Sequence, residues 1–365
     1  RYTAEQGPKV LGDEKRDMQD GHAIISYQPI GVILGIQPWN FPLYQVIRYA
    51  CANVMAGNTT VLKHAGNVFG MAEKIEQLFK LAGFDDYCFK NLLIDGKTAS
   101  ELIDHSAIRG VTFTGSDGTG KKVAERAAKQ VKKTVLELGS NDAYIVLDDA
   151  DLNTAITACT QGRLINNGQT CVAAKRFIVV DALYDDFKAL IKEQFEQVVL
   201  GDPNDEKTTL GPMARKDLRD QLHQQVTDSV NAGATIITGG KVAEHTGFYY
   251  TPTLLENIKP GMPAYDDELF GPVASLIRAK DNAEAMQIAN DSRYGLGGGI
   301  FSKDEQAAIE LAKLHFDTGM VNINGYGLAQ PNLPFGGVKD SGYGREHGGF
   351  GLREFVNIKT IMVND

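Results

Sequence analysis

One cysteine stands in a segment whose composition suits a reactive thiol. Cys171 ends the run Asn-Asn-Gly-Gln-Thr-Cys at residues 166–171, after a predicted helix at 152–164 and before an apolar run at 177–180 that predicts a buried strand. Nucleophiles must be reachable, and they often lie in connections of this kind. The alternative is a small buried hydrophobe, which is the ordinary role of a lone cysteine. Catalysis by Cys171 therefore depends on partners elsewhere in the chain.

Two residues could supply those partners. Glu137 lies near the end of a predicted strand at 134–138, and in an α/β sheet the carboxyl ends of strands are where ligands bind. Partial burial would raise its pKa toward working pH and suit it to be a general base; the alternative is an ordinary edge carboxylate. Asn40 lies between Pro38 and Pro42, which stiffen its turn. Its amide could donate to an oxyanion, or it could be a plain turn asparagine.

A glycine-rich turn offers a place for a phosphate. The run Gly-Ser-Asp-Gly-Thr-Gly-Lys at 115–121 follows a predicted strand and opens a predicted helix, whose N-terminus attracts anions. It nearly matches the phosphate-binding loop of nucleotide hydrolases, but Lys122 stands where a hydroxyl should hold magnesium. A turn without a ligand is the alternative. Lys63, which follows an apolar strand, could hold a phosphate or a sugar hydroxyl, or could be a solvated strand end.

The composition limits the class of protein. The chain has 365 residues, 43% of them hydrophobic and 23% charged, which is ordinary for a globular protein large enough for two domains. A net charge of −9 gives nucleic-acid binding no electrostatic basis. No apolar run approaches the length of a membrane span, and no secretory signal is visible in the sequence. Four cysteines without a CxxC pair suit a reducing compartment, so we expect a cytoplasmic protein. The seven histidines show no metal-ligand spacing, so no metal is predicted.

The elements that must position these residues alternate between strands and helices. Predicted strands at 31–36, 59–63, 91–94, 110–114 and 134–138 are separated by predicted helices at 43–56, 71–82, 99–104 and 121–129, and this alternation restarts after Ser140. Such a pattern predicts parallel sheets with crossover helices. We expect a domain boundary near residues 138–141, and a glycine-rich, irregular segment at 335–351.

Six motifs now occur in order along the whole chain. They are Pro-Trp-Asn-Phe-Pro at 38–42, Phe-Thr-Gly-Ser at 113–116, Leu-Glu-Leu-Gly at 136–139, Asn-Gly-Gln-Thr-Cys at 167–171, Glu-Leu-Phe-Gly-Pro at 268–272 and Pro-Phe-Gly-Gly-Val-Lys at 334–339. Together they resemble the NAD(P)-dependent aldehyde dehydrogenase superfamily. The Lys-His-Ala run at 63–65 makes the chain most similar to bacterial succinate-semialdehyde dehydrogenases.

The resemblance implies a fold and a domain plan. The fold would be α/β, with two Rossmann-like open parallel-sheet domains and a small β extension for oligomerisation. The cofactor-binding domain would span 1–139, with oligomerisation strands near 17–27, and the catalytic domain 140–339. The tail at 340–365 would carry another oligomerisation strand, giving a homodimer or homotetramer. Family members usually carry a further N-terminal helical segment, and this chain starts late, with Arg1.

The resemblance also implies roles for the site residues. Cys171 would attack the aldehyde, the Asn40 side chain and the Cys171 N–H would hold the oxyanion, and Glu137 would activate the water that hydrolyses the thioester. The residues near the cofactor would be Pro38, Trp39, Lys63, Gly66, Gly115, Ser116, Leu138, Glu268 and Phe270. The product would be a carboxylate, with succinate semialdehyde the expected substrate. Three alternatives stay open: a broad-specificity aldehyde dehydrogenase, a phosphate-loop nucleotide hydrolase and a non-catalytic scaffold.

Departures from the family pattern bear on cofactor and substrate. Gly66 stands where many NAD-preferring members have a glutamate, and losing that carboxylate removes repulsion against a 2′-phosphate, so NADP should be preferred over NAD. Arg48 lies where succinate-semialdehyde dehydrogenases carry an arginine for the distal carboxylate, and guanidinium suits that group; the alternative is a surface arginine. The second arginine of such sites is replaced by Ile165. Arg163, two residues earlier, is the remaining candidate for contact with the substrate, although the shift of two positions changes its direction.

Overall fold

The computed structural model describes all 365 residues, which form two compact units. Unit 1 contains residues 1–138, 329–336 and 342–365, and unit 2 contains residues 139–328 and 337–341. The chain therefore passes from unit 1 to unit 2 directly after Glu137 and Leu138. The predicted limits of the cofactor-binding domain, the catalytic domain and the tail remain predictions, because a compact unit is not by itself an independently folding domain. No helix is both long enough and apolar enough to cross a membrane.

Unit 1 is built on a six-stranded sheet. The strand order is β17-β7-β6-β3-β4-β5, and all neighbours are parallel except β17, which runs antiparallel to β7. The strands are β3 (Val32–Gln37), β4 (Thr59–His64), β5 (Phe89–Asn91), β6 (Ile108–Thr114), β7 (Lys133–Glu137) and β17 (Gly342–Tyr343). Apolar side chains on both faces, such as Ile33 and Leu34, are fully buried, as expected for a parallel sheet covered by helices.

The helices of unit 1 follow the strands in the predicted alternation. They are α1 (Tyr2–Val10), α2 (Tyr44–Met55), the 3₁₀ helix η1 (Gly66–Val68), α3 (Phe69–Leu81), α4 (Gly96–Leu102), α5 (Asp117–Lys129) and α12 (Phe350–Arg353). The strand register decides where the functional residues fall. Glu137 pairs with Thr114, and Phe113 pairs with Ile36, so β7, β6 and β3 end at the same edge of the sheet. The turns that follow β3 and β6 leave from that edge.

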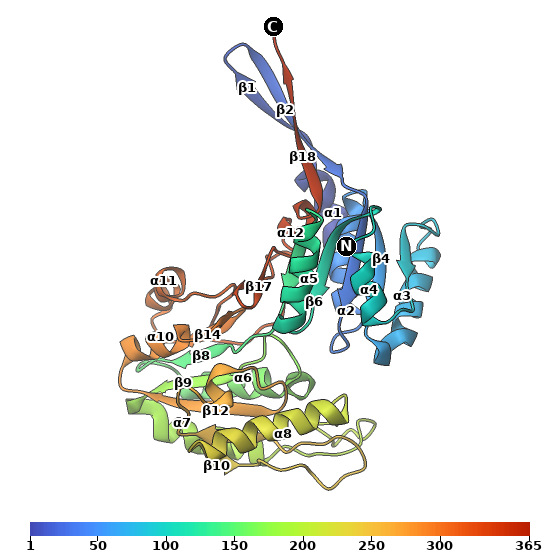
Figure 1. Cartoon of the computed structure of the whole chain (residues 1–365). Helices are drawn as coiled ribbons and strands as arrows, with labels where there is room; N and C mark the ends of the chain where they lie inside the picture. Colours follow the sequence, from blue (N-terminus) through green and yellow to red (C-terminus); the bar gives the residue numbers. More distant parts are fainter. The chain divides into compact units, whose positions relative to one another are not determined.

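A second, three-stranded antiparallel sheet in unit 1 joins the two ends of the chain. Its order is β1-β2-β18, with β1 at Glu14–Met18, β2 at Gly21–Pro29 and β18 at Val356–Val363. In Figure 1 the red C-terminal strand lies beside the blue hairpin. The side chains of Ile358 and Met362 are 59% and 64% exposed, which is unusual for apolar residues of a sheet.

Unit 2 contains a seven-stranded sheet with the order β10-β11-β12-β9-β8-β14-β15, antiparallel only between β10 and β11. Its strands are β8 (Ala143–Val146), β9 (Arg176–Val180), β10 (Thr235–Thr238), β11 (Thr253–Glu256), β12 (Val273–Ala279), β14 (Gly298–Phe301) and β15 (Asn322–Ile323). Ile178 belongs to the core on one face and Phe177 to the core on the other, so β9 is buried on both sides.

Helices cover both faces of that sheet. They are α6 (Leu152–Leu164), the 3₁₀ helix η2 (Ile165–Gly168), α7 (Asp181–Glu196), α8 (Lys216–Asn231), α9 (Pro263–Asp266), α10 (Asn282–Asn290) and α11 (Glu305–His315). A two-residue antiparallel pair joins β13 (Tyr294–Gly295) to β16 (Val338–Lys339). The prediction that 335–351 is wholly irregular is therefore wrong, since β16, β17 and the start of α12 lie there. Gly342 explains β17: a Cβ there would lie 2.0 Å from the carbonyl of Leu136, so only glycine allows this pairing.

Candidate active site

The turn that carries Asn40 is fixed by contacts from Gln45 and from His64. It connects β3 to α2, and the buried Gln45 donates from Nε2 to Oδ1 of Asn40 at 3.1 Å. Because this bond uses the oxygen of the amide, it places the NH₂ group on the opposite branch of the side chain. An amide held with its donor in a set direction is what an oxyanion partner requires.

His64 supports both ends of the same turn. Its ring is fully buried, with Nε2 2.8 Å from the carbonyl of Pro42 and Nδ1 3.2 Å from the carbonyl of Gln37. The N–H of Ala65 lies 3.0 Å from Nδ1. Burial lowers the pKa of His64. The neutral ring that donates from Nε2 to Pro42 and accepts from Ala65 at Nδ1 satisfies the two shortest contacts. In the sequence, His64 stands out only as part of a motif, and nothing there indicates this supporting role.

Glu137 is the last residue of β7 and is only 2% exposed. Neither oxygen of its carboxyl group has a hydrogen-bond partner. Burial, and then the neighbouring carboxylate of Glu346, raises the pKa of Glu137 well above its usual range. Arg48 and Arg345 act in the opposite direction. A buried carboxyl group with a raised pKa and open acceptor positions has the properties of a general base near neutral pH.

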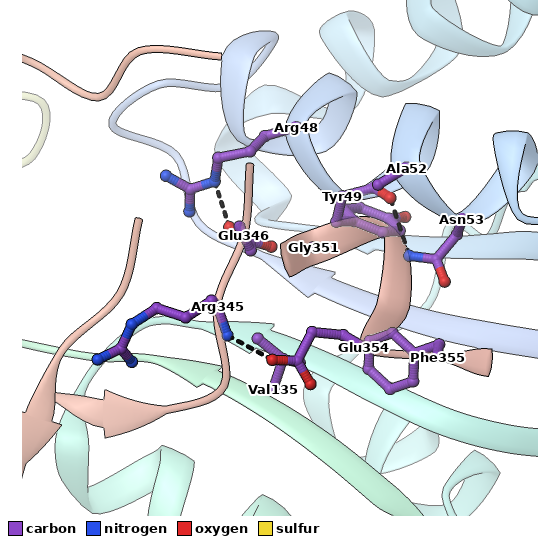
Figure 2. Close-up of a pocket in the computed structure, with 10 residues that line it drawn as sticks. All are labelled: Arg48, Tyr49, Ala52, Asn53, Val135, Arg345, Glu346, Gly351, Glu354 and Phe355. Carbon is purple, nitrogen blue, oxygen red and sulfur yellow. Dashed lines mark hydrogen bonds and ion pairs between the residues drawn. The ribbon is translucent and has the colours of Figure 1, made fainter. Parts of the chain in front are cut away.

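Arg48 and Glu346 form a buried ion pair beside Glu137. The pair joins Nε of Arg48 on α2 to Oε2 of Glu346, and the two side chains are 3% and 6% exposed. The guanidinium also lies over the ring of Phe335, 4.4 Å from its centroid. Figure 2 shows the pair at a small pocket, where the backbone N–H of Arg345 also donates to Glu354 at 2.7 Å. The alternative of a surface arginine at residue 48 is therefore wrong, because Glu346 and Phe335 compensate its burial.

The features predicted to hold a cofactor in unit 1 lie at the same sheet edge. Gly115 donates its N–H to the carbonyl of Glu137 at 3.0 Å, and Ser116 occupies the N-cap position of α5 without a capping hydrogen bond from its side chain. A Cβ at Gly120 would lie 2.4 Å from the side chain of Leu138, so this glycine lets α5 approach β7 closely. Close helix–strand packing and an accessible helix N-terminus suit a dinucleotide pyrophosphate.

The residues predicted near the adenosine ribose follow β4. Lys63 is half-buried, and burial lowers its pKa while Asp95 opposes that shift. Gly66 opens η1, and a Cβ there would meet only Phe69, at 4.0 Å. The space beside Gly66 would therefore admit a larger group. Trp39 and Pro38 lie in the turn after β3, at the carboxyl edge of the sheet where such ligands bind.

In unit 2, Cys171 follows a backbone segment with an uncommon conformation. Asn166, Asn167 and Gly168 all have positive φ, at 51°, 56° and 70°. Asparagine tolerates the left-handed region, and at Gly168 a Cβ would lie 2.2 Å from the carbonyl of Gly271. Conformations of this kind cost free energy and concentrate at functional sites. Cys171 itself is half-buried.

Arg163 contacts the backbone of the segment before Cys171. It is fully buried at the end of α6, and its Nη2 donates to the carbonyl of Gly168 at 2.6 Å. Burial lowers the pKa of Arg163 to about 10. Its observed partner is therefore the backbone of the segment before Cys171. A contact between Arg163 and the substrate stays a prediction.

Glu268 lies in the connection between α9 and β12, and Phe270 follows it, half-buried. Oε1 of Glu268 accepts from the N–H of Ser140 at 3.1 Å and lies 3.2 Å from Nζ of Lys175. Burial raises the pKa of Glu268, and Lys175 opposes the shift. Lys175 was not singled out from the sequence. The one signal available was its place directly before a strand that is apolar on both faces, where a cation must find partners.

The four free cysteines include Cys51, Cys88 and Cys159, and burial raises the pKa of each of these thiols. They lack the features of a reactive site. No group of three or more histidine, cysteine or carboxylate side chains could hold a metal ion.

Comparison with known proteins identifies the family of the chain. The model of the aldehyde dehydrogenase family matches residues 1–361. The chain is 46% identical to a succinate-semialdehyde dehydrogenase [NADP(+)] of Deinococcus radiodurans, over 99% of this chain and 75% of the relative. It is also 46% identical to a succinate semialdehyde dehydrogenase [NAD(P)+] of Escherichia coli, over 99% of this chain and 78% of the relative.

Solved structures agree with this assignment. The crystal structure of a succinic semialdehyde dehydrogenase from Streptococcus pyogenes, in complex with NADP+, has a TM-score of 0.97 and 39% identity, over 100% of this chain and 80% of that one. A match of this quality confirms the predicted α/β dehydrogenase fold, and the family match leaves no support for a phosphate-loop hydrolase. The chain belongs to the aldehyde dehydrogenase family.

Proposed function

We propose that this chain oxidises succinate semialdehyde to succinate with NADP as the preferred cofactor, through a thioester on Cys171. The observation that carries the proposed reaction is Glu137, a buried carboxyl group without a hydrogen-bond partner whose pKa is raised by its surroundings. A base of this kind is what hydrolysis of an acyl-enzyme requires. Without it, a cysteine adduct could form but would not turn over to a free acid.

In the proposed reaction, the thiolate of Cys171 attacks the aldehyde carbon and the carbonyl oxygen becomes an oxyanion. The amide of Asn40 and the backbone N–H of Cys171 donate to that oxyanion. When bound, NADP would supply the acceptor for the hydride that the tetrahedral carbon loses. The carbon is then a thioester on Cys171. Glu137 takes a proton from water, the resulting hydroxide adds to the thioester, and the C–S bond breaks to release the carboxylate and the thiol.

The substrate proposal comes from the relatives and from Arg48. The relatives from Deinococcus radiodurans and Escherichia coli are named for succinate semialdehyde, and each aligns with nearly all of this chain. Arg48 would pair with the distal carboxylate of that substrate, a match to which guanidinium is suited. A broad-specificity aldehyde dehydrogenase is the second candidate. The ion pair between Arg48 and Glu346 favours it, because that pair already gives the guanidinium an anionic partner.

The preference for NADP has two supports. Gly66 brings no negative charge to the end of β4, and Lys63 on that strand offers a cation to a 2′-phosphate. The relative from Deinococcus radiodurans is named for NADP(+), while the one from Escherichia coli is named for either cofactor. Glu268 and Phe270 would lie near the nicotinamide ribose in the same proposal.

We also propose that the chain forms a homodimer or homotetramer through the β1-β2-β18 sheet. The support is the exposed apolar side chains of β18, among them Ile358 and Met362. A partner chain of the same kind would cover them. The proposed location of the enzyme is the cytoplasm.

The test is a steady-state comparison of two aldehydes of equal chain length, succinate semialdehyde and butanal, each with NADP and with NAD. We expect the highest kcat/KM for succinate semialdehyde with NADP, and loss of turnover in Cys171→Ala. Equal kcat/KM values for the two aldehydes would support the broad-specificity candidate instead. Turnover that survives in Cys171→Ala would remove the thioester mechanism.

A further inference from the structure

A buried lysine near Cys171 makes three contacts through its own ammonium group. Lys175 lies four residues after Cys171 and directly before β9, and its side chain is 1% exposed. Its Nζ donates to the carbonyl of Thr170 at 3.2 Å and to the carbonyl of Cys171. The third contact is with Oε1 of Glu268, at 3.2 Å. An ammonium group has three N–H donors and no acceptor, so these three acceptors account for its full capacity.

The carbonyls that Lys175 contacts decide where the nearby N–H groups point. In a planar trans peptide the C=O and the N–H of the same unit point in opposite directions. The carbonyl of Thr170 belongs to the same peptide unit as the N–H of Cys171. Since that carbonyl is drawn toward Lys175, and also accepts from the N–H of Ala173 at 3.1 Å, the N–H of Cys171 is directed away from the buried side.

We propose that Lys175 is a positioning residue that sets the oxyanion-binding N–H of Cys171, by fixing the two peptide units on either side of the nucleophile. The inference rests on the proposed function, because it takes Cys171 as the nucleophile. It goes further in assigning the direction of the backbone donor to one side chain outside the reacting groups. Arg163, which donates to the carbonyl of Gly168, extends the same support to the start of the segment.

The same ammonium joins the nucleophile segment to the residue proposed to hold the cofactor ribose. Glu268 also accepts from the N–H of Ser140, so its carboxylate is held between a backbone donor and Lys175. Removing the lysine should therefore affect two properties, whereas removing the carboxylate charge should affect only one. Glu268→Gln should weaken cofactor binding and leave the Cys171 peptide in place. Lys175→Met should disturb both, and this difference separates the two roles.

The test uses two reactions of Cys171 that need neither aldehyde nor cofactor. In the first, the thiolate attacks the carbonyl of 4-nitrophenyl acetate, an oxyanion forms, the C–O bond breaks and nitrophenolate leaves as the acetyl thioester is produced. In the second, the thiolate displaces iodide from iodoacetamide, and no oxyanion forms. The limiting alkylation rate at high pH reports the access and the intrinsic reactivity of the thiolate alone.

For Lys175→Met we expect the acylation rate to fall at least about 10-fold, and the limiting alkylation rate to stay within about 2-fold of the parent. Full loss of an oxyanion donor costs about 10²–10³-fold, and the remaining bond from Ala173 should preserve part of the geometry. Lys175→Gln, which keeps an N–H donor without the charge, should lose less. Lys192→Met is the matched control, since that lysine is exposed and pairs with Glu196 on α7; both rates should stay at the parent level.

Equal falls in both rates would overturn the proposal, because they would indicate general disorder of the segment. Unchanged acylation in Lys175→Met would overturn it as well. If Lys175→Met does not fold, as judged by its melting curve, the same comparison is made with Lys175→Gln and decides in the same way. Acylation that persists in Cys171→Ala would instead show that the nucleophile, and with it the proposed function, is wrong. Failure to oxidise succinate semialdehyde would leave the result on Lys175 untouched.

Discussion

Replacing Arg48 separates two roles that the sequence and the structure give it. As a substrate anchor, it should affect only aldehydes with a distal carboxylate. As the partner of Glu346, it should affect the stability of unit 1 whatever the substrate. The side chains of the pair are 3% and 6% exposed, so Arg48→Met leaves a buried carboxylate without its cation. The cost of breaking a buried pair from one side is about 3–5 kcal/mol.

The double variant Arg48→Met/Glu346→Leu supplies the control for stability. Replacing both members of a buried pair by apolar residues is often neutral or stabilising, so most of the loss should be recovered. At about 2–4 °C per kcal/mol for a unit of this size, the single variant should melt on the order of 10 °C below the parent, and the double variant close to it. Melting curves for the parent, both single variants and the double variant complete the cycle.

Kinetics with succinate semialdehyde and butanal then test the anchor. Hydrogen bonds to charged groups contribute about 1.5–3 kcal/mol, so Arg48→Met should lower kcat/KM for succinate semialdehyde by roughly 10- to 150-fold more than for butanal. Glu346→Gln, which keeps the guanidinium, should retain the discrimination. If Arg48→Met lowers kcat/KM equally for the two aldehydes while its melting temperature falls, the arginine is structural and the carboxylate-anchor argument is refuted.

Three further predictions concern single residues of unit 1. Burial raises the pKa of Glu137, so the native state holds that proton more tightly than the unfolded chain and loses stability as pH rises from the ordinary carboxyl range through the raised pKa. Glu137→Gln should therefore melt at a higher temperature than the parent at pH 8, by a margin that vanishes near pH 4. The same variant should accumulate an acyl-enzyme detectable by mass spectrometry. Normal turnover of the thioester in this variant would show that Glu137 is not the base. His64→Ala leaves the carbonyl of Pro42 unsatisfied, at about 1–3 kcal/mol, and should lower kcat through the Asn40 turn; an unchanged kcat would show that the turn does not need the imidazole. Gly66→Glu should reduce kcat/KM with NADP about 10- to 100-fold relative to NAD, since like charges in contact cost several kcal/mol, and a constant cofactor ratio would place the 2′-phosphate elsewhere.

The sequence predicted the architecture well, because that architecture follows from local patterns. The helix expected at 152–164 is α6, and the apolar run at 177–180 lies within β9. Strand lengths were less well predicted, since pairing with neighbours sets them: the strand expected at 91–94 is observed as Phe89–Asn91, because Thr60 of β4 pairs with Phe89. The short strand at Gly342 was missed for a related reason. Its pairing with β7 is a long-range contact that no local pattern in a glycine-rich segment can indicate.

The candidate site residues were predicted from motifs, but their surroundings were not. Nothing in the spacing of Arg48 and Glu346 predicts that they pair, as they are almost three hundred residues apart in the chain. The partners of Lys175 were equally hidden. Two of them are backbone carbonyls, which carry no sequence signal at all. The pairing of buried charged groups was therefore visible only in the structure, whereas the candidate reacting groups were predicted from the motifs.

Buried charges explain how each unit prepares its own part of the proposed chemistry. In unit 1 a carboxyl group must act as a base. The fold buries Glu137 and places Glu346 nearby, and both effects raise its pKa. Arg48 and Arg345 act against this rise. In unit 2 the requirement is direction. There the fold buries Lys175 and Arg163 so that backbone carbonyls near Cys171 face inward. Apolar residues could fill either space at lower desolvation cost. Charged side chains at these buried positions are therefore better explained by the control they exert on a pKa and on a peptide orientation than by any gain in stability.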